Sequence, residues 1–421
     1  MQFKEIIYCL SQIMQVFIFV GGCYLFSISV LGFFAGIKKT EKKFPPKKRF
    51  ALVIAAHNEE VVIDQIIESL KKQNYPSELY DIFVIADNCT DNTASIAEQH
   101  GALVYERNDL NHKGKGYALE WMFEKIYRMG DRYDAICVFD ADNLVSANFL
   151  SEMNNSLCSG YKVVQGYLDS KNPFDSWITC SYSIAFWLSN YLYQLPRYQL
   201  GLSCGLCGTG FCVTLDVLKK IGWGATCLTE DLEFTMKLAL NNMKIAWAHN
   251  AVVYDEKPLT LRQSWNQRRR WMQGHADCIS RFANSLFKKA LKEHNIIAFD
   301  CGVYLFQPVR FLFIGLLTLM MWIQSIFPDT PFFSLKDLFP IEVWYVFVTI
   351  QFFYGPLVVL AARKLNFKVF AGFLVYPLYC LTWAPITIQG FLRKNEKNWS
   401  HTIHTRKISI NDLEKELRRT Q

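Results

Sequence analysis

The stretch from residue 6 to residue 36 contains no charged side chain. An α-helix needs only about 20 apolar residues to cross the hydrocarbon layer of a bilayer, so this run is long enough to cross one. It is too long for the apolar core of a signal peptide, and no convincing cleavage site follows it. Further apolar stretches occupy residues 303–327, 343–362 and 369–392. The sequence therefore predicts an integral membrane protein whose polar part lies between an N-terminal helix and three later segments.

Basic side chains follow the first apolar run, from Lys38 to Arg49, and Glu41 alone opposes them. The positive-inside rule places such a run in the cytoplasm, so we expect a plasma-membrane protein with a cytoplasmic catalytic domain. Pro377 and Pro385 favour a last apolar segment that is broken or re-entrant. The expected organisation is an N-terminal transmembrane helix at 1–37, a basic linker at 38–49, an α/β domain at 50–258, amphipathic interface helices at 259–300, three transmembrane or re-entrant segments at 301–392 and a polar tail at 393–421.

The amino-acid composition excludes fewer functions than the order of apolar and polar segments does. The net charge of +7 is modest, and no basic face of the kind that binds nucleic acid is visible. The thirteen cysteines have no regular spacing, and several lie inside apolar runs, so we interpret them as reduced, small hydrophobic residues. The pair Cys204 and Cys207 lacks a second pair or nearby histidines, which argues against zinc.

Short apolar runs alternate with longer helical patterns between residues 50 and 258, which predicts a mainly parallel sheet with helices on both faces. Ligands bind beyond the carboxyl ends of such strands. The predicted strands are 50–55, 82–86, 103–105, 136–139, 163–165, 244–248 and 251–254, and the predicted helices between them are 61–73, 94–99, 117–129 and 148–157.

Acidic loops follow several of these strands, and they contain Glu59, Asp87 and the pair Asp140 and Asp142. Two carboxylates one residue apart on a turn can share a hard divalent cation, although surface turns often contain the same pair. Further along, Thr229-Glu230-Asp231 precedes a predicted helix, where a threonine could cap the helix and acids suit its positive end.

A basic segment, Gln267-Arg268-Arg269-Arg270-Trp271, lies in an amphipathic helix predicted for residues 260–282. The planar fork of arginine matches two phosphate oxygens at once, and an indole can lie flat against a sugar ring. The alternative is a basic interfacial helix that binds anionic lipid head groups.

Taken together, Asp87, Asp140-Ala141-Asp142, Thr229-Glu230-Asp231 and the segment from Gln267 to Trp271 resemble the D, DxD, TED, QxxRW signature. The sequence is therefore similar to the membrane-embedded family 2 glycosyltransferases, which include the cellulose, chitin, hyaluronan and poly-N-acetylglucosamine synthases. The resemblance implies a GT-A fold, which is a Rossmann-like domain that binds a nucleotide sugar, fused to transmembrane helices.

The same resemblance assigns roles to single residues. It places Asp87 and Glu59 at the uridine, Lys113 at the donor, and Asp140 and Asp142 at the diphosphate and its metal. In this assignment Asp231 is the general base within Thr229-Glu230-Asp231, and Arg270 faces the leaving diphosphate. The residues expected to border the acceptor are Gly208, Thr209, Gln267 and Trp271.

The activity expected from this resemblance is inverting, processive polymerisation of a β-linked polysaccharide from a UDP-sugar, with export of the product. UDP-glucose and a β-glucan are favoured, and a UDP-N-acetylglucosamine polymer synthase is the alternative. A second enzyme hypothesis is a glucosyltransferase with a lipid acceptor, and a third is an inactive scaffold or transport subunit. The expected cofactor is Mg²⁺ or Mn²⁺, with membrane lipids and an accessory export or regulatory subunit as further partners. Arg310, within an apolar stretch, marks either a channel mouth or a side chain that reaches the membrane surface.

Overall fold

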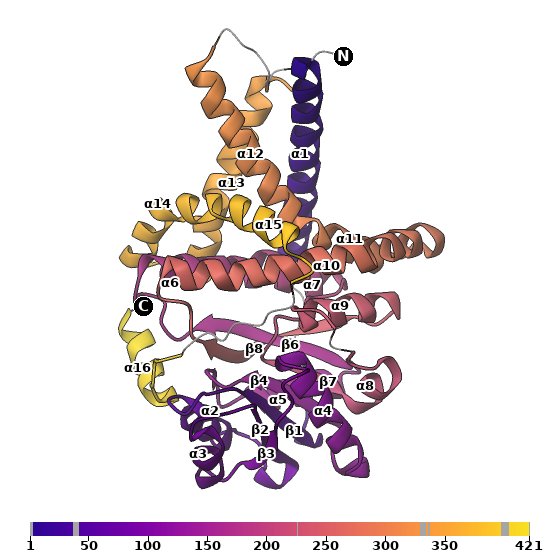
Figure 1. Cartoon of the computed structure of the whole chain (residues 1–421), viewed down its shortest axis with the longest axis vertical. Coiled ribbons are helices and arrows are strands. Elements are labelled where there is room, and N and C mark those ends of the chain that lie inside the picture. The colour runs from indigo at the N-terminus through magenta and orange to yellow at the C-terminus, as the bar shows by residue number, and fades with distance from the viewer. Residues whose placement is uncertain are drawn as a thin grey trace.

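The computed structural model describes residues 3–36, 42–224, 226–328, 334–335, 337–396 and 404–420. Lys38, Lys39 and Glu41 of the basic linker therefore lie outside the described residues, as do residues 397–403 of the predicted polar tail. Within the described ranges the elements follow the chain from a long N-terminal helix, through an α/β part, to a second group of long helices (Figure 1).

An eight-stranded sheet forms the centre of the α/β part, in the order β3-β2-β1-β4-β7-β6-β8-β5. Strands β1 to β4 pair in parallel, whereas β7 is antiparallel to both β4 and β6, and β5 is antiparallel to β8. The strands are β1 (Phe50–Ala56), β2 (Tyr80–Asp87), β3 (Leu103–Arg107), β4 (Ala135–Asp140), β5 (Leu144–Val145), β6 (Val163–Ser170), β7 (Phe211–Thr214) and β8 (Ile245–Asp255).

Helices cover both faces of this sheet, and the alternation of side chains along β1 explains why. Ala51 and Val53 pack in one buried cluster with helices α4 and α6, while Leu52 and Ile54 pack in another with α2 and α5. The helices of this part are α2 (Ile63–Lys71), α3 (Thr93–Gln99), α4 (Lys115–Tyr127), α5 (Phe149–Cys158), α6 (Trp177–Ser189), α7 (Leu195–Leu200), α8 (Leu215–Ile221) and α9 (Glu230–Leu240).

The sheet differs from the sequence prediction in the second half of the domain. Strand β7 was not predicted, and the two predicted strands at 244–248 and 251–254 form one continuous strand, β8. Since β7 is antiparallel to β4, the loop that enters β7 lies beside the loop that leaves β4, and the Gly210 N–H donates to the Val138 carbonyl at 2.9 Å. Side-chain alternation alone does not reveal strand direction, and this antiparallel insertion is what positions the site described below.

Among the described residues, four helical stretches are long and apolar enough to cross a membrane by length and composition, at 5–35, 307–326, 341–361 and 367–392. In Figure 1, α1, α12 and α13 rise from the α/β part, whereas α14 and α15 lie across their foot, above α10. The last apolar stretch is broken at Thr382, between α14 and α15, in agreement with the predicted interruption. The bounds are α1 (Phe3–Gly36), α10 (Leu261–Glu293), α11 (Ile296–Leu305), α12 (Gln307–Ile326), α13 (Ile341–Ala361), α14 (Phe367–Leu381), α15 (Trp383–Leu392) and α16 (Ile410–Thr420).

A buried polar cluster joins α1 to the α/β part. Arg197 in α7 donates from Nε and Nη2 to the Asp300 carboxylate of α11, at 2.7 and 2.9 Å. The Tyr24 hydroxyl of α1 donates to the same carboxylate at 2.9 Å. Arg197 and Asp300 are each 1% exposed, and a buried pair costs several kcal/mol when one partner is lost. The cluster therefore fixes the first helix on the domain.

The C-terminal segment returns to the α/β part instead of extending away from it. Ile410 and Leu413 of α16 are buried against Leu144 of β5. The backbone N–H groups of Thr405 and Arg406 donate to the Glu256 carboxylate, both at 3.1 Å. The sequence predicted a polar tail, and the structure adds that a helix in this tail packs on the domain.

Candidate active site

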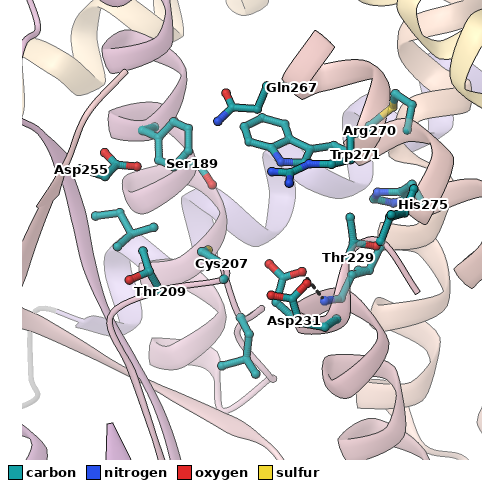
Figure 2. Close-up of a pocket in the computed structure, with 18 of the residues that line it drawn as sticks. Ser189, Cys207, Thr209, Thr229, Asp231, Asp255, Gln267, Arg270, Trp271 and His275 are labelled. Atoms are coloured by element: carbon teal, nitrogen blue, oxygen red, sulfur yellow. Dashed lines mark hydrogen bonds between the residues drawn. The ribbon is translucent and has the colours of Figure 1, made fainter. Parts of the chain in front are cut away.

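A single cavity of about 1170 Å³ lies between the carboxyl ends of the strands, helix α10 and the feet of α1, α12 and α13. Figure 2 shows Gln267, Arg270 and Trp271 above this space and Asp231, Cys207 and Thr209 below it. Every site residue predicted from the sequence lines the cavity, namely Glu59, Asp87, Lys113, Asp140, Asp142, Gly208, Thr209, Thr229, Glu230, Asp231, Gln267, Arg270 and Trp271.

The turn after β4 is fixed by the loop that enters β7. The Asp140 N–H donates to the Thr209 hydroxyl at 3.1 Å, and the Thr209 hydroxyl in turn bonds the side chain of Asn143. Gly208 has a φ of +81°, a backbone conformation that glycine adopts without strain. A Cβ there would also come within 3.5 Å of the Asp231 Oδ2 atom. The loop therefore bonds the turn after β4 through Thr209 and passes beside Asp231 at Gly208.

Lys115 occupies the centre of the acidic residues. Its Nζ bonds the Asp140 carboxylate and donates to the Gly208 carbonyl, the latter at 2.7 Å. The nearby charges of Asp140 and Glu230 raise its pKa, although burial opposes its charge. The sequence analysis instead placed Lys113, from the same basic loop, at the donor. Both lysines line the cavity, but Lys115 is the one whose Nζ bonds Asp140 of the acidic pair.

At the other end of the cavity, Asp87 and Glu59 each have a basic partner. Arg107 Nη1 donates to Asp87 Oδ1 at 2.6 Å. Nδ1 of His404, from the C-terminal segment, lies 2.9 Å from Glu59 Oε1. Burial opposes a charge on His404, yet Asp142 and Glu59 together raise its pKa to about 9. A residue more than 340 positions away in the chain thus forms part of the same wall as Glu59.

Helix α9 begins at Glu230, and its start packs tightly on helix α10. A Cβ at Gly274 of α10 would collide with the Thr229 side chain, so glycine permits this contact. Thr229 precedes the helix as predicted, but its side chain makes no capping hydrogen bond. Its Oγ1 lies 3.3 Å from the sulfur of Cys227 instead. The alternative that Thr229 serves as a helix cap is therefore wrong, and its side chain packs against α10 instead.

The environment of Asp231 suits a base that works near neutral pH. Burial and the adjacent Glu230 charge raise the pKa of Asp231 to about 7, while the Leu232 N–H and Lys115 act in the opposite direction. Burial also raises the pKa of Glu230, against the charges of Lys115 and Arg270. A carboxylate with a raised pKa in a cleft is a common feature of catalytic acids and bases.

The consecutive arginines of α10 have different surroundings. Arg270 lines the cavity, whereas Arg268 is fully buried against α14 and α15. The Arg268 guanidinium lies 4.3 Å from the Tyr379 ring centroid and donates to the Thr382 hydroxyl at 2.8 Å. Arg268 thus holds the break between α14 and α15, a structural role that the sequence did not reveal.

Tyr182 of α6 orients the remaining residues of this segment. Its hydroxyl donates to Gln267 Oε1 at 3.0 Å, and its ring packs edge-on to Trp271 with centroids 6.2 Å apart. Gln267 and Trp271 therefore face the cavity from a supported position on α10.

The donor atoms at Asp140 and Asp142 fit a hard divalent cation. Burial and the neighbouring Asp140 charge raise the pKa of Asp142 to about 6, against the opposing charge of His404, so a further positive charge would stabilise the ionised form. No group of three or more metal-ligating side chains occurs within the described part of the chain. A cation here would therefore take its other ligands from a bound diphosphate and water, as Mg²⁺ commonly does.

A mixed sheet of this order, with acidic loops and basic side chains around one cavity, defines a GT-A glycosyltransferase fold. The chain belongs to the family described as "Glycosyltransferase like family 2", which matches residues 45–274. Since the matched region contains β1 to β8 and the motif segment of α10, the family assignment covers the whole α/β part.

Similar proteins include the "Probable glycosyltransferase YdaM" of Bacillus subtilis, which is 25% identical over 87% of this chain and 89% of its own length. The "Beta-monoglucosyldiacylglycerol synthase" of Synechocystis is 28% identical over 54% of this chain. This chain spans about half of that relative, 48% of its length. The "Poly-beta-1,6-N-acetyl-D-glucosamine synthase" of Staphylococcus epidermidis is 24% identical over 68% of this chain and 69% of its own length.

Among solved structures, the mannosyltransferase PcManGT of Pyrobaculum calidifontis, in complex with GDP-Man and Mn²⁺, superposes with a TM-score of 0.59. The match covers 91% of this chain and 99% of that chain at 14% sequence identity. This likeness extends the shared fold beyond the α/β part to the long helices.

Proposed function

We propose that this protein is an inverting hexosyltransferase that takes its donor from a UDP-sugar and transfers the sugar to an acceptor presented from the membrane. The observation that carries the proposal is the single cavity, because it joins the predicted donor residues to Asp231 and continues between α1, α12 and α13. Asp87 and Glu59 would hold the uridine, with Lys113 and Lys115 near the diphosphate. Gly208, Thr209, Gln267 and Trp271 would border the acceptor.

In the proposed reaction the acceptor hydroxyl attacks the anomeric carbon while Asp231 takes its proton. The new glycosidic bond forms on one side of that carbon as the bond to the diphosphate oxygen breaks on the other, so UDP leaves and the configuration inverts. Arg270 and Lys115 stabilise the negative charge that grows on the leaving diphosphate, usually a large part of catalysis. The charge of Glu230 raises the pKa of Asp231, and Thr229 packs the start of the same helix against α10.

The proposed cofactor is Mg²⁺ or Mn²⁺, held by Asp140 and Asp142. When bound, it supplies positive charge that neutralises the departing diphosphate. The PcManGT structure contains Mn²⁺ with a nucleotide sugar, which supports a divalent ion in this fold.

The membrane end of the cavity favours a lipid acceptor. The lining residues of α1 lie between Gly22 and Ser29, and those of α12 end at Phe311. Beyond them, Ile18 and Leu317 are buried in an apolar cluster with Phe313 and Phe347 between the same helices. A lipid head group needs only the lower part of this space, and the Synechocystis relative is named for a glycolipid synthase.

The second candidate is the processive synthesis and export of a polysaccharide, with UDP-glucose and a β-glucan favoured and UDP-N-acetylglucosamine as the alternative donor. Polar and aromatic side chains along the cavity, among them Gln307, Gln351, Tyr354 and Trp383, support it, because sugar polymers pack against such groups. The Staphylococcus relative is named for a polymer synthase. This candidate requires the apolar cluster around Leu317 to open, and an accessory export subunit would be a natural partner.

The two candidates are distinguished by the product. Purified full-length protein in lipid nanodiscs is incubated with radiolabelled UDP-glucose or UDP-N-acetylglucosamine, and the product is divided into solvent-extractable lipid and insoluble polymer. Label in the lipid fraction supports the first candidate, whereas label that only linkage-specific glycanases release supports the second. Asp231→Asn is the matched inactive control. If wild-type protein releases no UDP from either donor, the hexosyltransferase proposal fails.

The proposed location is the plasma membrane, with the α/β part in the cytoplasm where UDP-sugars are made. The basic residues Lys42, Lys43, Lys47, Lys48 and Arg49, between α1 and β1, support this orientation. Protease added to sealed, right-side-out vesicles should leave the α/β part intact, and rapid cleavage within it would reverse the proposed orientation.

A further inference from the structure

The membrane end of the cavity contains one arginine that the proposed reaction does not use. Arg310 lies in the first turn of α12 and lines the cavity. Its side chain passes across Gly21 and Gly22 of α1. A Cβ at Gly22 would lie 3.4 Å from Arg310 Nη2, and one at Gly21 would lie 3.9 Å from Arg310 Cδ. The Arg310 side chain therefore lies directly against this part of α1.

Among the residues that the structure describes, Arg310 has no carboxylate counter-ion. Its Nε atom is buried without a hydrogen-bond partner, and no ion pair joins Arg310 to a carboxylate within the described ranges. The same cavity is also lined by Phe26, Phe311 and the hydrogen-bonded pair of Ser29 and Tyr354. A cation in such an environment is costly unless an anion accompanies it.

We propose that Arg310 binds the phosphate of the acceptor lipid, so that the acceptor is a phospholipid with a hydroxylated head group. This inference rests on the proposed hexosyltransferase function, whose acceptor it specifies. The planar guanidinium matches two phosphate oxygens. Exposed apolar side chains cover the outer faces of α1, α12 and α13, including Leu31, Trp322 and Phe352, and these are surfaces on which acyl chains pack.

The cavity gives this lipid a defined orientation. With the phosphate at Arg310, the head-group hydroxyl extends past Gln307 and Tyr304 toward Asp231, since all of these line the same space. The hydroxyl oxygen bonds to the anomeric carbon, its proton passes to Asp231, and the bond from that carbon to the UDP oxygen breaks. The lipid phosphate remains unchanged, which distinguishes it from the diphosphate of the donor.

A neutral glycerolipid offers nothing to Arg310, and this difference makes the inference testable. Purified full-length protein in detergent micelles receives radiolabelled UDP-glucose, or UDP-N-acetylglucosamine, with phosphatidylglycerol, diacylglycerol or soluble glycerol phosphate as acceptor. Transfer to a lipid is measured as solvent-extractable label, and transfer to glycerol phosphate is measured as label in the soluble sugar phosphate. UDP release without any acceptor is measured on the same preparation. The variants are Arg310→Gln and Arg310→Lys, and Arg262→Gln, at an exposed position of α10, is the matched control.

We expect transfer to phosphatidylglycerol at least tenfold better than to diacylglycerol. Arg310→Gln should raise the KM for the phospholipid about tenfold or more, and Arg310→Lys should give an intermediate KM. In both variants, UDP release without acceptor should stay within twofold of wild type. Equal transfer to diacylglycerol, an unchanged phospholipid KM in Arg310→Gln, or UDP release with no labelled lipid would each overturn the inference.

Equal use of glycerol phosphate would overturn the lipid as the source of the phosphate. The comparison of acceptors on wild-type protein does not depend on any variant, so a variant that fails to fold leaves the test intact. Absence of UDP release from wild-type protein with either donor would instead overturn the proposed hexosyltransferase function.

Discussion

Asp231→Asn should stabilise the protein and inactivate it at the same time, with a pH dependence that follows from the site. Burial and the charge of Glu230 raise the pKa of Asp231 from 3.8 to about 7. The folded state therefore binds more protons than the unfolded state between these values, and the stability that this carboxyl contributes is lost as the pH rises through the interval. Asparagine has no such ionisation.

The size of the effect follows from the shift. Each pKa unit corresponds to about 1.4 kcal/mol, so ionising Asp231 in the folded protein costs about 4 kcal/mol at a pH well above 7. Near pH 5 the carboxyl is protonated in the folded state but ionised in the unfolded state. Folding must then take up a proton, which costs about 1.5 kcal/mol of stability. The stability advantage of Asp231→Asn should therefore grow by about 2–3 kcal/mol between pH 5 and pH 8, which is roughly 5–10 °C in Tm for a domain of this size.

The assay is thermal unfolding at both pH values, followed by tryptophan fluorescence, with sugar transfer measured on the same preparations. Loss of the base should lower transfer by about 10²–10⁴-fold. In wild type, kcat/KM should rise with pH to a plateau above about 7. Asp216→Asn is the control, since this exposed carboxylate pairs with Lys162 at the surface. A Tm difference between Asp231→Asn and wild type that stays constant from pH 5 to pH 8 would refute the reasoning.

Other predictions concern the metal, the donor side of the cavity, the C-terminal segment and one of the cysteines that line the cavity. Excess EDTA should abolish transfer and added Mg²⁺ or Mn²⁺ should restore it, and full activity in chelator would contradict a metal at the acidic pair. Lys115→Met should raise the KM for the UDP-sugar about tenfold or more, because a charge-assisted hydrogen bond is lost. Lys113→Met should change this KM less. The reverse order would favour Lys113 as the donor contact. His404→Ala removes a positive charge from between two acidic residues and should lower Tm. The control His100→Ala, at an exposed surface pair, should leave Tm unchanged. Equal Tm values for the two variants would show that the C-terminal segment contributes little to stability. N-ethylmaleimide should inactivate wild type through Cys227, which lines the cavity, and Cys227→Ser should resist it; undiminished inactivation of that variant would identify another thiol.

The sequence predicted the parallel half of the sheet because each strand there is a short apolar run followed by a helix. It also predicted that the acidic loops converge, since the carboxyl ends of parallel strands share one edge. Strand β7 was missed because Phe211–Thr214 directly follows a glycine-rich loop and leads straight into α8, so no separate apolar run stands out. Its antiparallel pairing depends on contacts with β4 and β6, which are distant in sequence.

The site residues of the four motifs were predictable because their chemistry repeats within the family, whereas their supports were not. Arg268 looks equivalent to Arg270 in the sequence, and only the helix geometry buries one against Tyr379 and turns the other toward the cavity. Lys115 could have been chosen over Lys113 from its place at the first position of α4, beside the strand ends. No local pattern marks His404, since its role depends on the return of the chain to the domain.

The buried link between Arg197 and Asp300 also has a consequence for synthesis on the ribosome. The two residues are separated by 103 positions, so Arg197 leaves the ribosome well before its partner. At translation rates of about 5–20 residues per second, roughly 5–20 s pass between the synthesis of Arg197 and the synthesis of Asp300. During that interval α1 is already made, yet the α/β part cannot close around Arg197 without burying an unpaired charge. The final docking of α1 is therefore timed by the arrival of α11, and a nascent chain stalled before Asp300 should remain sensitive to protease.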